Sequence, residues 1–278
     1  MILMVQLIDG KTISKVREEK VKKEVSSLNF SPKVISIVIG EDAPSLLYTK
    51  MKQKKASNVG IDFEPKYFSQ DTPIEEVVNF IRKLNENPSI NGIMIQLPIP
   101  EGFLKGKDWR EILSEIKIEK DVDGLRYPDS KFLPATARAV LSILDDEKID
   151  VRNKKVIVLG RSNLVGKPVA DELLKRGADI NVVHSQTPNP KELTLKGDIV
   201  ISAVGKPFLV KGDWIKEGAV VIDVGTSEDE DTGKIVGDID FEQAKLRASK
   251  ITPVPRGVGP MTVISLMENV VESAKGRN

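Results

Sequence analysis

Apolar, β-branched runs alternate with amphipathic stretches along the whole chain, a pattern typical of α/β architecture. In the first half, the predicted strands are 34–39, 63–68 and 90–97. The predicted helices of that half are 45–58, 74–85 and 109–116. A short strand is expected at Met1–Leu7, and the segment 102–129 is charged and loop-rich outside its helix.

The second half is a regular series in which strands and helices follow one another. Its predicted strands are 155–159, 180–183, 199–203, 219–224 and 251–254. Its predicted helices are 137–145, 168–175 and 261–274. Such a βαβ series forms a parallel sheet with helices on both faces. The acidic run Glu228–Asp231 is expected to be a solvated turn.

The sharpest local signal is the turn that follows the strand 155–159. The chain runs from Gly160 through Arg161 and Ser162 to Gly166, and a helix follows at once. Free backbone N–H groups and the positive end of a helix dipole would then face a pyrophosphate group. The strict G-x-G-x-x-G pattern is absent, so the alternative is an ordinary strand–turn–helix connection.

The end of the next strand bears on which nicotinamide cofactor would bind. NAD-binding units carry an Asp or Glu there, which accepts a hydrogen bond from the ribose 2′-hydroxyl. Here the strand ends at His184 and Ser185, with no carboxylate. Together with Arg161 these residues suit a 2′-phosphate, so the sequence favours NADP. His184 taken alone is more typical of a hydrogen-bonding loop residue.

Composition narrows the class of protein. With 278 residues, 40% hydrophobic and 30% charged, the chain suits a globular protein of two domains. No apolar run approaches the roughly 20 residues that cross a membrane, and the first residues lack a basic leader. Without cysteine and with one histidine, thiolate metal sites are excluded and a catalytic metal is not expected. A net charge of +1 gives no field for nucleic acid, so we expect a cytoplasmic protein that acts on small molecules.

Further motifs are spread across the chain in a distinctive order. They are Ser45–Lys52 leading to Gly60-Ile61, Gly92–Pro98, Lys120–Gly124 and Thr252–Thr262. With the Gly160 turn and His184-Ser185, they resemble in order and approximate spacing the bifunctional methylenetetrahydrofolate dehydrogenase/cyclohydrolase family. The resemblance covers nearly the whole chain, and it implies a homodimeric enzyme of one-carbon metabolism and purine biosynthesis.

The chemistry of the matched residues suits a folate site. Tyr48 and Lys52 lie on one helical stripe with Ser45, so that the phenol can stack on a pterin and the amine can reach the reacting carbon. Gln96 ends a buried strand, and Asp123 can accept from the adjacent N–H donors of a 2-aminopterin. The family pattern implies that Lys52, Gln96 and Asp123 are catalytic and that Tyr48, Ser45 and Pro260 bind substrate. Without the other motifs, these residues would be typical of a basic surface helix, a strand-end amide and a turn-forming Asp.

On the same resemblance, the cofactor is NADP. The expected cofactor-binding residues are Gly160, Arg161, Ser162, Val165, Gly166, His184, Ser185, Gly205, Gly225 and Thr226. The implied reactions are oxidation of 5,10-methylenetetrahydrofolate by NADP+ and hydrolysis of the methenyl product to 10-formyltetrahydrofolate, without a metal. The alternatives are a dehydrogenase with little cyclohydrolase activity, an enzyme that uses NAD, and a nucleotide sensor without catalysis. Retention of the three catalytic residues together argues against the sensor.

Residues 1–137 are expected to form an α/β folate-binding catalytic domain, which the C-terminal helix, residues 258–278, completes. Residues 138–257 are expected to form a Rossmann-type NADP-binding domain, with the active site in the cleft between the two. The chain departs from the family pattern at Ala135-Thr136-Ala137, where Cys-Thr-Pro is usual, and at Arg256, where glycine is usual. Arg256 fits only if its backbone avoids conformations reserved for glycine, and its guanidinium would then either aid binding of the anionic folate tail or lie on the surface without a role.

Overall fold

The computed structural model describes residues 5–276, and the chain folds into two compact units. The six-stranded unit comprises the residues up to Lys15 together with Thr136–Thr262, and the three-stranded unit comprises Val16–Ala135 and the residues from Val263 onward. Residues 1–4 of the predicted first strand lie outside the described residues. Among the described residues, no helix is long and apolar enough to span a membrane.

The three-stranded unit is built on a short parallel sheet with the order β3-β2-β4. Its strands are β2 (Lys33–Ile39), β3 (Asp62–Phe68) and β4 (Gly92–Ile95), and they confirm the three strands predicted for this half. Apart from Lys33 at its start, every residue of β2 is buried, as expected of a central strand in a sheet covered on both faces.

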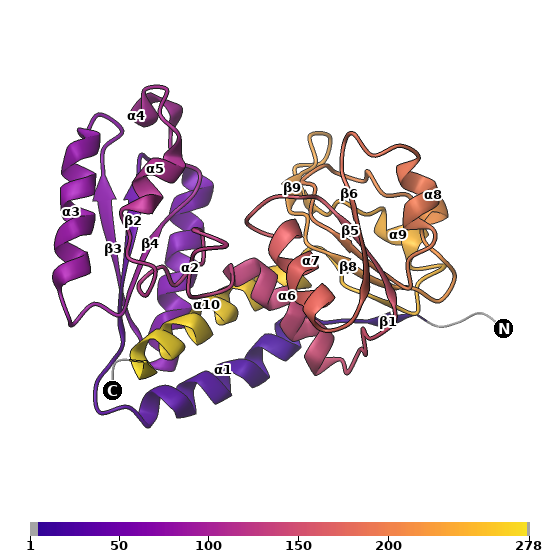
Figure 1. The fold of residues 1–278 in the computed structure, drawn as a ribbon, viewed down its shortest axis with the longest axis horizontal. Coiled ribbons are helices and arrows are strands. Elements are labelled where there is room, and N and C mark those ends of the chain that lie inside the picture. The colour runs from indigo at the N-terminus through magenta and orange to yellow at the C-terminus, as the bar shows by residue number, and fades with distance from the viewer. Residues whose placement is uncertain (1–4, 277–278) are drawn as a thin grey trace. The chain divides into compact units, whose positions relative to one another are not determined.

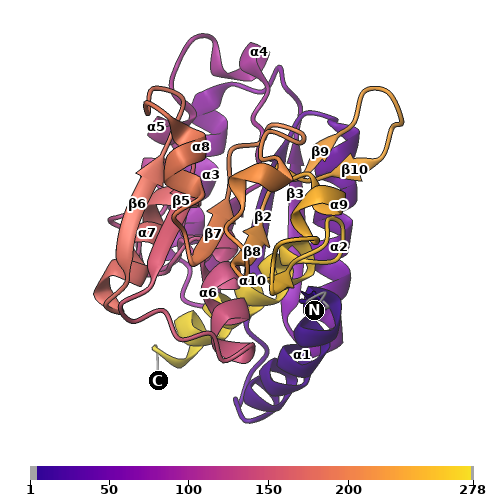
Figure 2. The ribbon, with the colours of Figure 1, turned by 90° about the vertical axis from the view of Figure 1, so that its right-hand side faces the viewer.

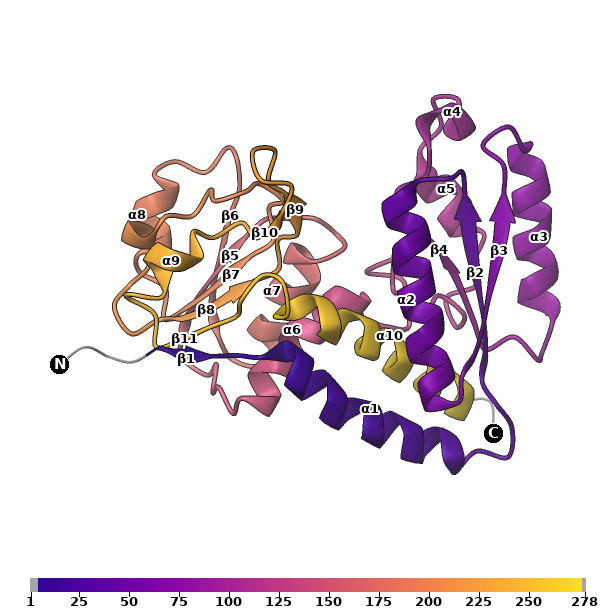
Figure 3. The ribbon, with the colours of Figure 1, turned by 180° about the vertical axis from the view of Figure 1, so that it is seen from behind.

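Helices lie on the two faces of this sheet (Figures 1 and 3). The helix α3 (Ile74–Glu86) covers one face, with α4 (Glu101–Leu104) and α5 (Trp109–Ser114) nearby, and α2 (Ala43–Val59) covers the other. On the α3 side, apolar residues of β2, β4, α3 and α5 form one continuous core. The other face is apolar as well, since Val34, Val38 and Met94, which alternate with the residues of that core along β2 and β4, are also buried.

The helix α1 (Gly10–Ser26) was not predicted. Its sequence is rich in lysine and glutamate, and only a thin apolar stripe that includes Val21 and Val25 is buried, so its helical period is weak. Within the three-stranded unit, Arg17 of α1 donates to Glu268 of α10 (Val258–Lys275) at 2.8 Å. The predicted C-terminal helix is confirmed, and it begins three residues earlier than predicted.

The six-stranded unit contains a fully parallel sheet with the order β1-β11-β8-β7-β5-β6. Its strands are β1 (Gln6–Leu7), β5 (Lys155–Leu159), β6 (Asp179–Val183), β7 (Ile199–Ser202), β8 (Val220–Asp223) and β11 (Lys250–Ile251). We expected the first residues in the folate domain, but β1 extends this sheet, because Ile8 N donates to Ile251 O at 2.8 Å.

Helices also cover both faces of the larger sheet. Figure 2 shows α8 (Pro190–Thr194) and α9 (Phe241–Ala244) over one face, and α6 (Ala135–Asp146) and α7 (Gly166–Lys175) pack on the other (Figure 1). Together with the three-stranded unit, this arrangement is the predicted two-domain α/β fold. The acidic run lies at a hairpin between β9 (Ser227–Glu228) and β10 (Ile235–Val236), so Asp229 to Asp231 form the expected turn.

The backbone at Arg256 adopts a conformation that favours glycine, contrary to the expectation from the sequence. Its φ is 89°, in the left-handed region that favours glycine. Its guanidinium donates to Asp9 Oδ2 at 2.8 Å, and both side chains belong to the six-stranded unit. The side chain is thus paired with a carboxylate of its own chain, which argues against the expected role in binding the folate tail.

The backbone at residue 256 makes a prediction about stability. Arg256→Gly and Arg256→Ala both remove the exposed ion pair, and they differ only in the Cβ atom. A Cβ in the left-handed region costs about 1–2 kcal/mol, which exceeds the chain entropy that glycine adds to the unfolded state. We expect the glycine variant to be more stable than the alanine variant by about 1 kcal/mol in chemical denaturation. Equal stability, or a more stable alanine variant, would contradict the left-handed conformation.

Candidate active site

The four predicted residues Tyr48, Lys52, Gln96 and Asp123 lie together in the three-stranded unit. Lys52 Nζ donates to Gln96 Oε1 at 3.1 Å and lies 3.9 Å from Asp123 Oδ2. The same amine lies 4.8 Å from the centre of the Tyr48 ring. Lys52 is only 5% exposed. A buried amine surrounded by an amide, a carboxylate and a phenol is typical of a functional site.

The helix α2 carries Lys52 on a buried stripe that is polar in its first half. Ser45, Thr49 and Lys52 are the buried residues there, whereas Ala56 and Val59 are buried in the second half. Thr49 Oγ1 donates to the Ser45 carbonyl at 2.8 Å, and Ser45 Oγ lies 3.4 Å from the Leu97 carbonyl as a hydrogen-bond donor. The polar stripe therefore meets the segment that follows β4.

Gln96 comes directly after β4, at the carboxyl end of the sheet. Its backbone N–H donates to the Ile37 carbonyl of β2 at 2.8 Å, which continues the pairing of the two strands by one residue. Its side-chain Nε2 donates to the Leu97 carbonyl at 2.8 Å. This second bond orients the amide so that its oxygen faces Lys52.

Asp123 lies in a loop that α10 anchors through Asn269. The Asn269 Nδ2 donates to the Val122 carbonyl at 2.8 Å and to the Leu133 carbonyl at 3.0 Å, on either side of the Asp123 loop. Asn269 is fully buried and was not predicted as a functional residue. Its position between the apolar residues Leu266-Met267 and Val270-Val271 of α10 is the sequence signal that would have identified a buried polar residue.

Burial sets the protonation of this site. Burial lowers the pKa of the Lys52 amine, and the neighbouring Asp123 carboxylate opposes that shift. Burial raises the pKa of the Tyr48 phenol, and Asp123 raises it further. In the same loop, burial raises the pKa of Asp121 to about 6, while hydrogen bonds from Arg126 N and other groups lower it. The Lys52 amine therefore loses its proton more readily than an ordinary lysine.

All ten predicted cofactor residues lie in the six-stranded unit, where the loops leave the carboxyl ends of four neighbouring strands. Gly160 to Gly166 follow β5, and His184 and Ser185 follow β6. Gly205 follows β7, while Gly225 and Thr226 follow β8. Ligands of open parallel sheets bind at this edge. The structure therefore brings the predicted set to one edge.

The turn after β5 has the close backbone packing expected of a phosphate-binding turn. Gly160 has a φ of 111°, and a Cβ on it would lie 2.3 Å from the Ala203 carbonyl oxygen. A Cβ on Gly166 would lie 2.1 Å from the Gly160 carbonyl oxygen. No side chain caps the N-terminus of α7. Lys167 N donates to the Ser162 carbonyl at 3.0 Å and Pro168 has no N–H, so Gly166 is the residue of this turn whose N–H can bind an anion. Neither glycine could be replaced without moving the turn.

The loop after β6 carries the predicted 2′-phosphate residues. Arg161 Nη2 lies 3.5 Å from Gln186 Oε1 as a donor, and both side chains are exposed. His184 Nδ1 accepts from the backbone N–H of Gln186 at 3.3 Å, which is the local loop role considered for it. Within residues 5–276, the structure places no cluster of three acidic or histidine side chains that could hold a metal ion.

Pro260 belongs to a different unit from the other predicted catalytic and substrate-binding residues. It lies in the first turn of α10, in the six-stranded unit, while Lys52 belongs to the three-stranded unit. Ser45, in contrast, is on the same helix as Tyr48 and Lys52 and is buried. The role of Pro260 in substrate binding stays a prediction.

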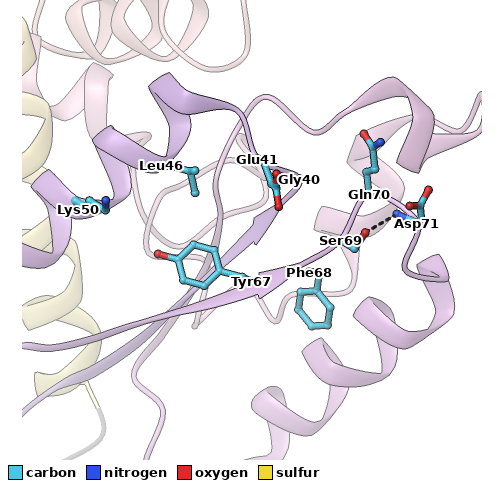
Figure 4. Close-up of a pocket in the computed structure, with 9 residues that line it drawn as sticks. All are labelled: Gly40, Glu41, Leu46, Lys50, Tyr67, Phe68, Ser69, Gln70 and Asp71. Carbon is cyan, nitrogen blue, oxygen red and sulfur yellow. Dashed lines mark hydrogen bonds between the residues drawn. The ribbon is translucent and has the colours of Figure 1, made fainter.

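A surface hollow of about 850 Å³ lies between α2 and the ends of β2 and β3 (Figure 4). Its lining residues are Gly40, Glu41, Leu46, Lys50, Tyr67, Phe68, Ser69, Gln70 and Asp71. Lys50 and Lys52 are two residues apart, so they project about 200° apart around α2. The hollow is therefore separate from the buried amine, and its charged groups are exposed.

Comparison with known proteins identifies the family to which the two units correspond. The catalytic domain of the tetrahydrofolate dehydrogenase/cyclohydrolase family matches residues 8–123, and the NAD(P)-binding domain of the same family matches residues 134–278. The chain belongs to this family. The predicted family and its two-domain α/β fold are thereby confirmed.

Individual members are similar over their full length. A bifunctional protein FolD from Lactobacillus acidophilus is 43% identical over 286 aligned residues, which cover 99% of each chain. The crystal structure of the bifunctional enzyme FolD from Campylobacter jejuni is 36% identical, with a TM-score of 0.93, over 99% of this chain and 100% of that one. A Trypanosoma brucei member, solved in complex with NADP and an inhibitor, is 34% identical with a TM-score of 0.88, and 98% of each chain is covered.

The environment of Lys52 predicts its titration. Because burial lowers its pKa, Lys52 should lose its proton at a lower pH than the exposed lysines of α2. Asp123 raises that pKa, so Asp123→Asn should lower it further. Both shifts can be followed by NMR of protein labelled at lysine Cε, with the Lys52 signal assigned from Lys52→Met. A Lys52 signal that titrates with the exposed lysines would contradict the lowered pKa.

Proposed function

We propose that the protein oxidises 5,10-methylenetetrahydrofolate with NADP+ and hydrolyses the methenyl product to 10-formyltetrahydrofolate, in one-carbon metabolism. The observation that carries the proposal is the buried Lys52 amine, which is held between Gln96 and Asp123 in a chain of this family. Full-length similarity to relatives that are named bifunctional supports both activities.

The proposed cofactor fits the edge of the six-stranded sheet. Gly160 and Gly166 let the backbone approach a pyrophosphate, and the Gly166 N–H together with the positive end of the α7 dipole favours its negative charge. The NADP complex of the related Trypanosoma brucei enzyme supports this cofactor. When bound, NADP+ supplies the hydride acceptor, so the protein's own contribution to the oxidation is alignment of substrate and cofactor.

Lys52 is the proposed proton-transferring group in the hydrolysis. Water adds to the methenyl carbon and loses a first proton to give a hydroxyl group. When the bond between that carbon and the ring nitrogen breaks, the nitrogen gains a proton, and the hydroxyl group releases its proton to solvent as the formyl C=O forms. A neutral amine can accept the first proton, and burial lowers the pKa of Lys52, which makes that form more accessible. The ammonium formed in this way can donate to the leaving nitrogen.

The neighbours of Lys52 have supporting roles in this proposal. Gln96 Oε1 accepts from the amine and thereby directs its lone pair away from the amide. Asp123 stabilises the protonated amine once it forms, and its carboxylate suits the N–H donors of a 2-aminopterin ring. Tyr48 offers an aromatic face on which a pterin can stack, and Ser45 lies one turn before it.

Selectivity for NADP is proposed from the loop after β6. No carboxylate follows β6 that could bind a ribose 2′-hydroxyl, and Arg161 and Ser185 offer donors to a 2′-phosphate. The homodimer and the cytoplasmic location remain predictions from the resemblance, as does binding of the substrate by Pro260. We propose them as parts of the same function.

The role of Lys52 can be tested by substitution. Lys52→Met removes the titratable amine and keeps much of the side-chain volume, so the fold should persist. We expect the hydrolysis of methenyltetrahydrofolate, followed by absorbance, to fall by about 10²–10⁴-fold. Lys50→Met is the matched control, because Lys50 is exposed on another side of the same helix. A Lys52→Met enzyme with the wild-type hydrolysis rate would remove the residue from the proposed mechanism.

The choice of cofactor can be tested at Arg161. Arg161→Ala removes a cation that only a 2′-phosphate requires, so KM for NADP+ should rise by about 10–100-fold while KM for NAD+ changes little. Initial rates of methylenetetrahydrofolate oxidation with each cofactor give both values. Equal losses for the two cofactors would show that Arg161 only supports the turn after β5.

A further inference from the structure

Two buried carboxylates at the edge of the six-stranded sheet have no part in the proposed chemistry. Asp223 is the last residue of β8, and Asp238 follows β10; they are 3% and 0% exposed. A buried carboxylate needs several hydrogen bonds to offset its loss of hydration. The partners of these two therefore indicate what they do.

Asp238 binds the loop that leaves β7. Its Oδ2 accepts from Val204 N at 2.7 Å and from Ser202 Oγ at 3.0 Å. Its Oδ1 accepts from Lys206 N at 2.9 Å. These bonds lie on both sides of Gly205, an exposed residue in the left-handed conformation. The shape of this loop therefore depends on a carboxylate that is more than 30 residues away in sequence.

Asp223 binds the loop that leaves its own strand, together with the segment that contains Asp238. Its Oδ1 accepts from Gly225 N at 2.9 Å and from Asp238 N at 3.1 Å. Its Oδ2 accepts from Ile239 N at 2.9 Å. Asp223 thus fixes the backbone of Gly225 and also the position from which Asp238 acts.

Two glycines leave room for the carboxylates. A Cβ on Gly225 would lie 2.3 Å from Asp238 Oδ1, and a Cβ on Gly237 would lie 2.0 Å from Asp223 Oδ2. Each carboxylate therefore lies against a backbone that could not carry a side chain. The two acids and the loops after β7 and β8 form one interlocked group.

The carboxylates have an electrostatic cost. Burial raises the pKa of Asp223 to about 7, hydrogen bonds from backbone N–H groups lower it, and the nearby Asp238 raises it. Apolar residues here would avoid that cost but would leave the N–H donors of both loops without acceptors. Perturbed acids of this kind are frequent next to functional sites.

The order of the strands indicates which part of the cofactor these loops would face. The phosphate-binding turn follows β5, and the strand that ends beside the adenosine ribose is β6. The strands β7 and β8 lie on the other side of β5. A dinucleotide that crosses the edge of the sheet would therefore place its nicotinamide half over the loops that follow β7 and β8.

We propose that Asp238 and Asp223 are positioning residues that hold the loops after β7 and β8 in the shape that receives the nicotinamide half of NADP. This inference rests on the proposed function. Neither acid touches the cofactor; each acts through backbone N–H groups near Gly205 and Gly225.

The test compares two ligands by calorimetry. Asp238→Asn keeps the size of the side chain but replaces one acceptor oxygen with an NH₂ group. This NH₂ group cannot accept a hydrogen bond from the donors of the loop after β7. We expect its Kd for NADPH to rise by about 10-fold or more. Its Kd for adenosine 2′,5′-bisphosphate, which lacks the nicotinamide half, should stay within about twofold of wild type. Asp223→Asn should give the same split.

Asp240→Asn is the matched control. Asp240 lies two residues after Asp238 and caps α9 by accepting from Gln243 N, so its loss should leave both affinities unchanged. Hydrolysis of methenyltetrahydrofolate without cofactor should also stay at the wild-type rate in all three variants, because Lys52 lies in the other unit. Equal losses for both ligands, or no loss for either, would overturn the positioning role.

If the Asp238→Asn or Asp223→Asn protein does not fold, a milder substitution at Ser202 tests the inference. Ser202→Ala removes one hydrogen bond to Asp238 Oδ2 and no charge, and it should weaken NADPH by about two- to fivefold, again without effect on the bisphosphate. An unchanged NADPH affinity in this folded variant would count against the proposal. A wild-type protein that binds no NADPH at all would instead refute the proposed function.

Discussion

In a parallel sheet all strands end at the same edge, and this constraint decides where both units carry their functional groups. In the three-stranded unit, Gln96 follows β4, and α2 with Lys52 begins shortly after β2 ends. In the six-stranded unit, the turns after β5, β6, β7 and β8 carry the proposed cofactor residues. Residues far apart in sequence thus meet because the strand direction places them at one edge. The side chains in those loops can change without a change in the sheets that position them.

The helix α2 shows how the three-stranded unit accommodates a buried amine. Its buried stripe contains Ser45, Thr49 and Lys52 where a stabilising helix would have apolar residues. The opposite face of the sheet, covered by α3, has the continuous apolar core. The face under α2 is apolar as well, since Val38 and Met94 are buried there. Burial of apolar residues on both faces of the sheet lets the unit accommodate a lysine whose charged form is disfavoured.

Strong patterns in the sequence were sufficient for the sheets but not for the surroundings of individual side chains. The apolar runs of β2, β5 and β8 located these strands to within two residues, because buried parallel strands are continuous in sequence. The helix α1 was missed because its buried stripe is thin. The strand β1 was assigned to the other domain because the sequence of a strand does not determine which strand it pairs with. The order of motifs identified Lys52, whereas its burial depends on packing that local composition does not encode. The left-handed backbone of Arg256 was likewise invisible, since φ is set by tertiary contacts.

Asp223 and Asp238 show why a carboxylate is needed at a buried position where a neutral amide would lose less hydration free energy. The loops after β7 and β8 are irregular, so their N–H groups have no strand to pair with and must find acceptors. A carboxylate offers two oxygens and no donor, whereas an Asn offers one oxygen and a donor group that the surrounding N–H groups cannot accept. Asp238 uses both oxygens for three donors, and so does Asp223. The charge is thus a consequence of the donor-rich backbone: the loops can be both irregular and ordered only because the acids replace the acceptors that a sheet would have supplied.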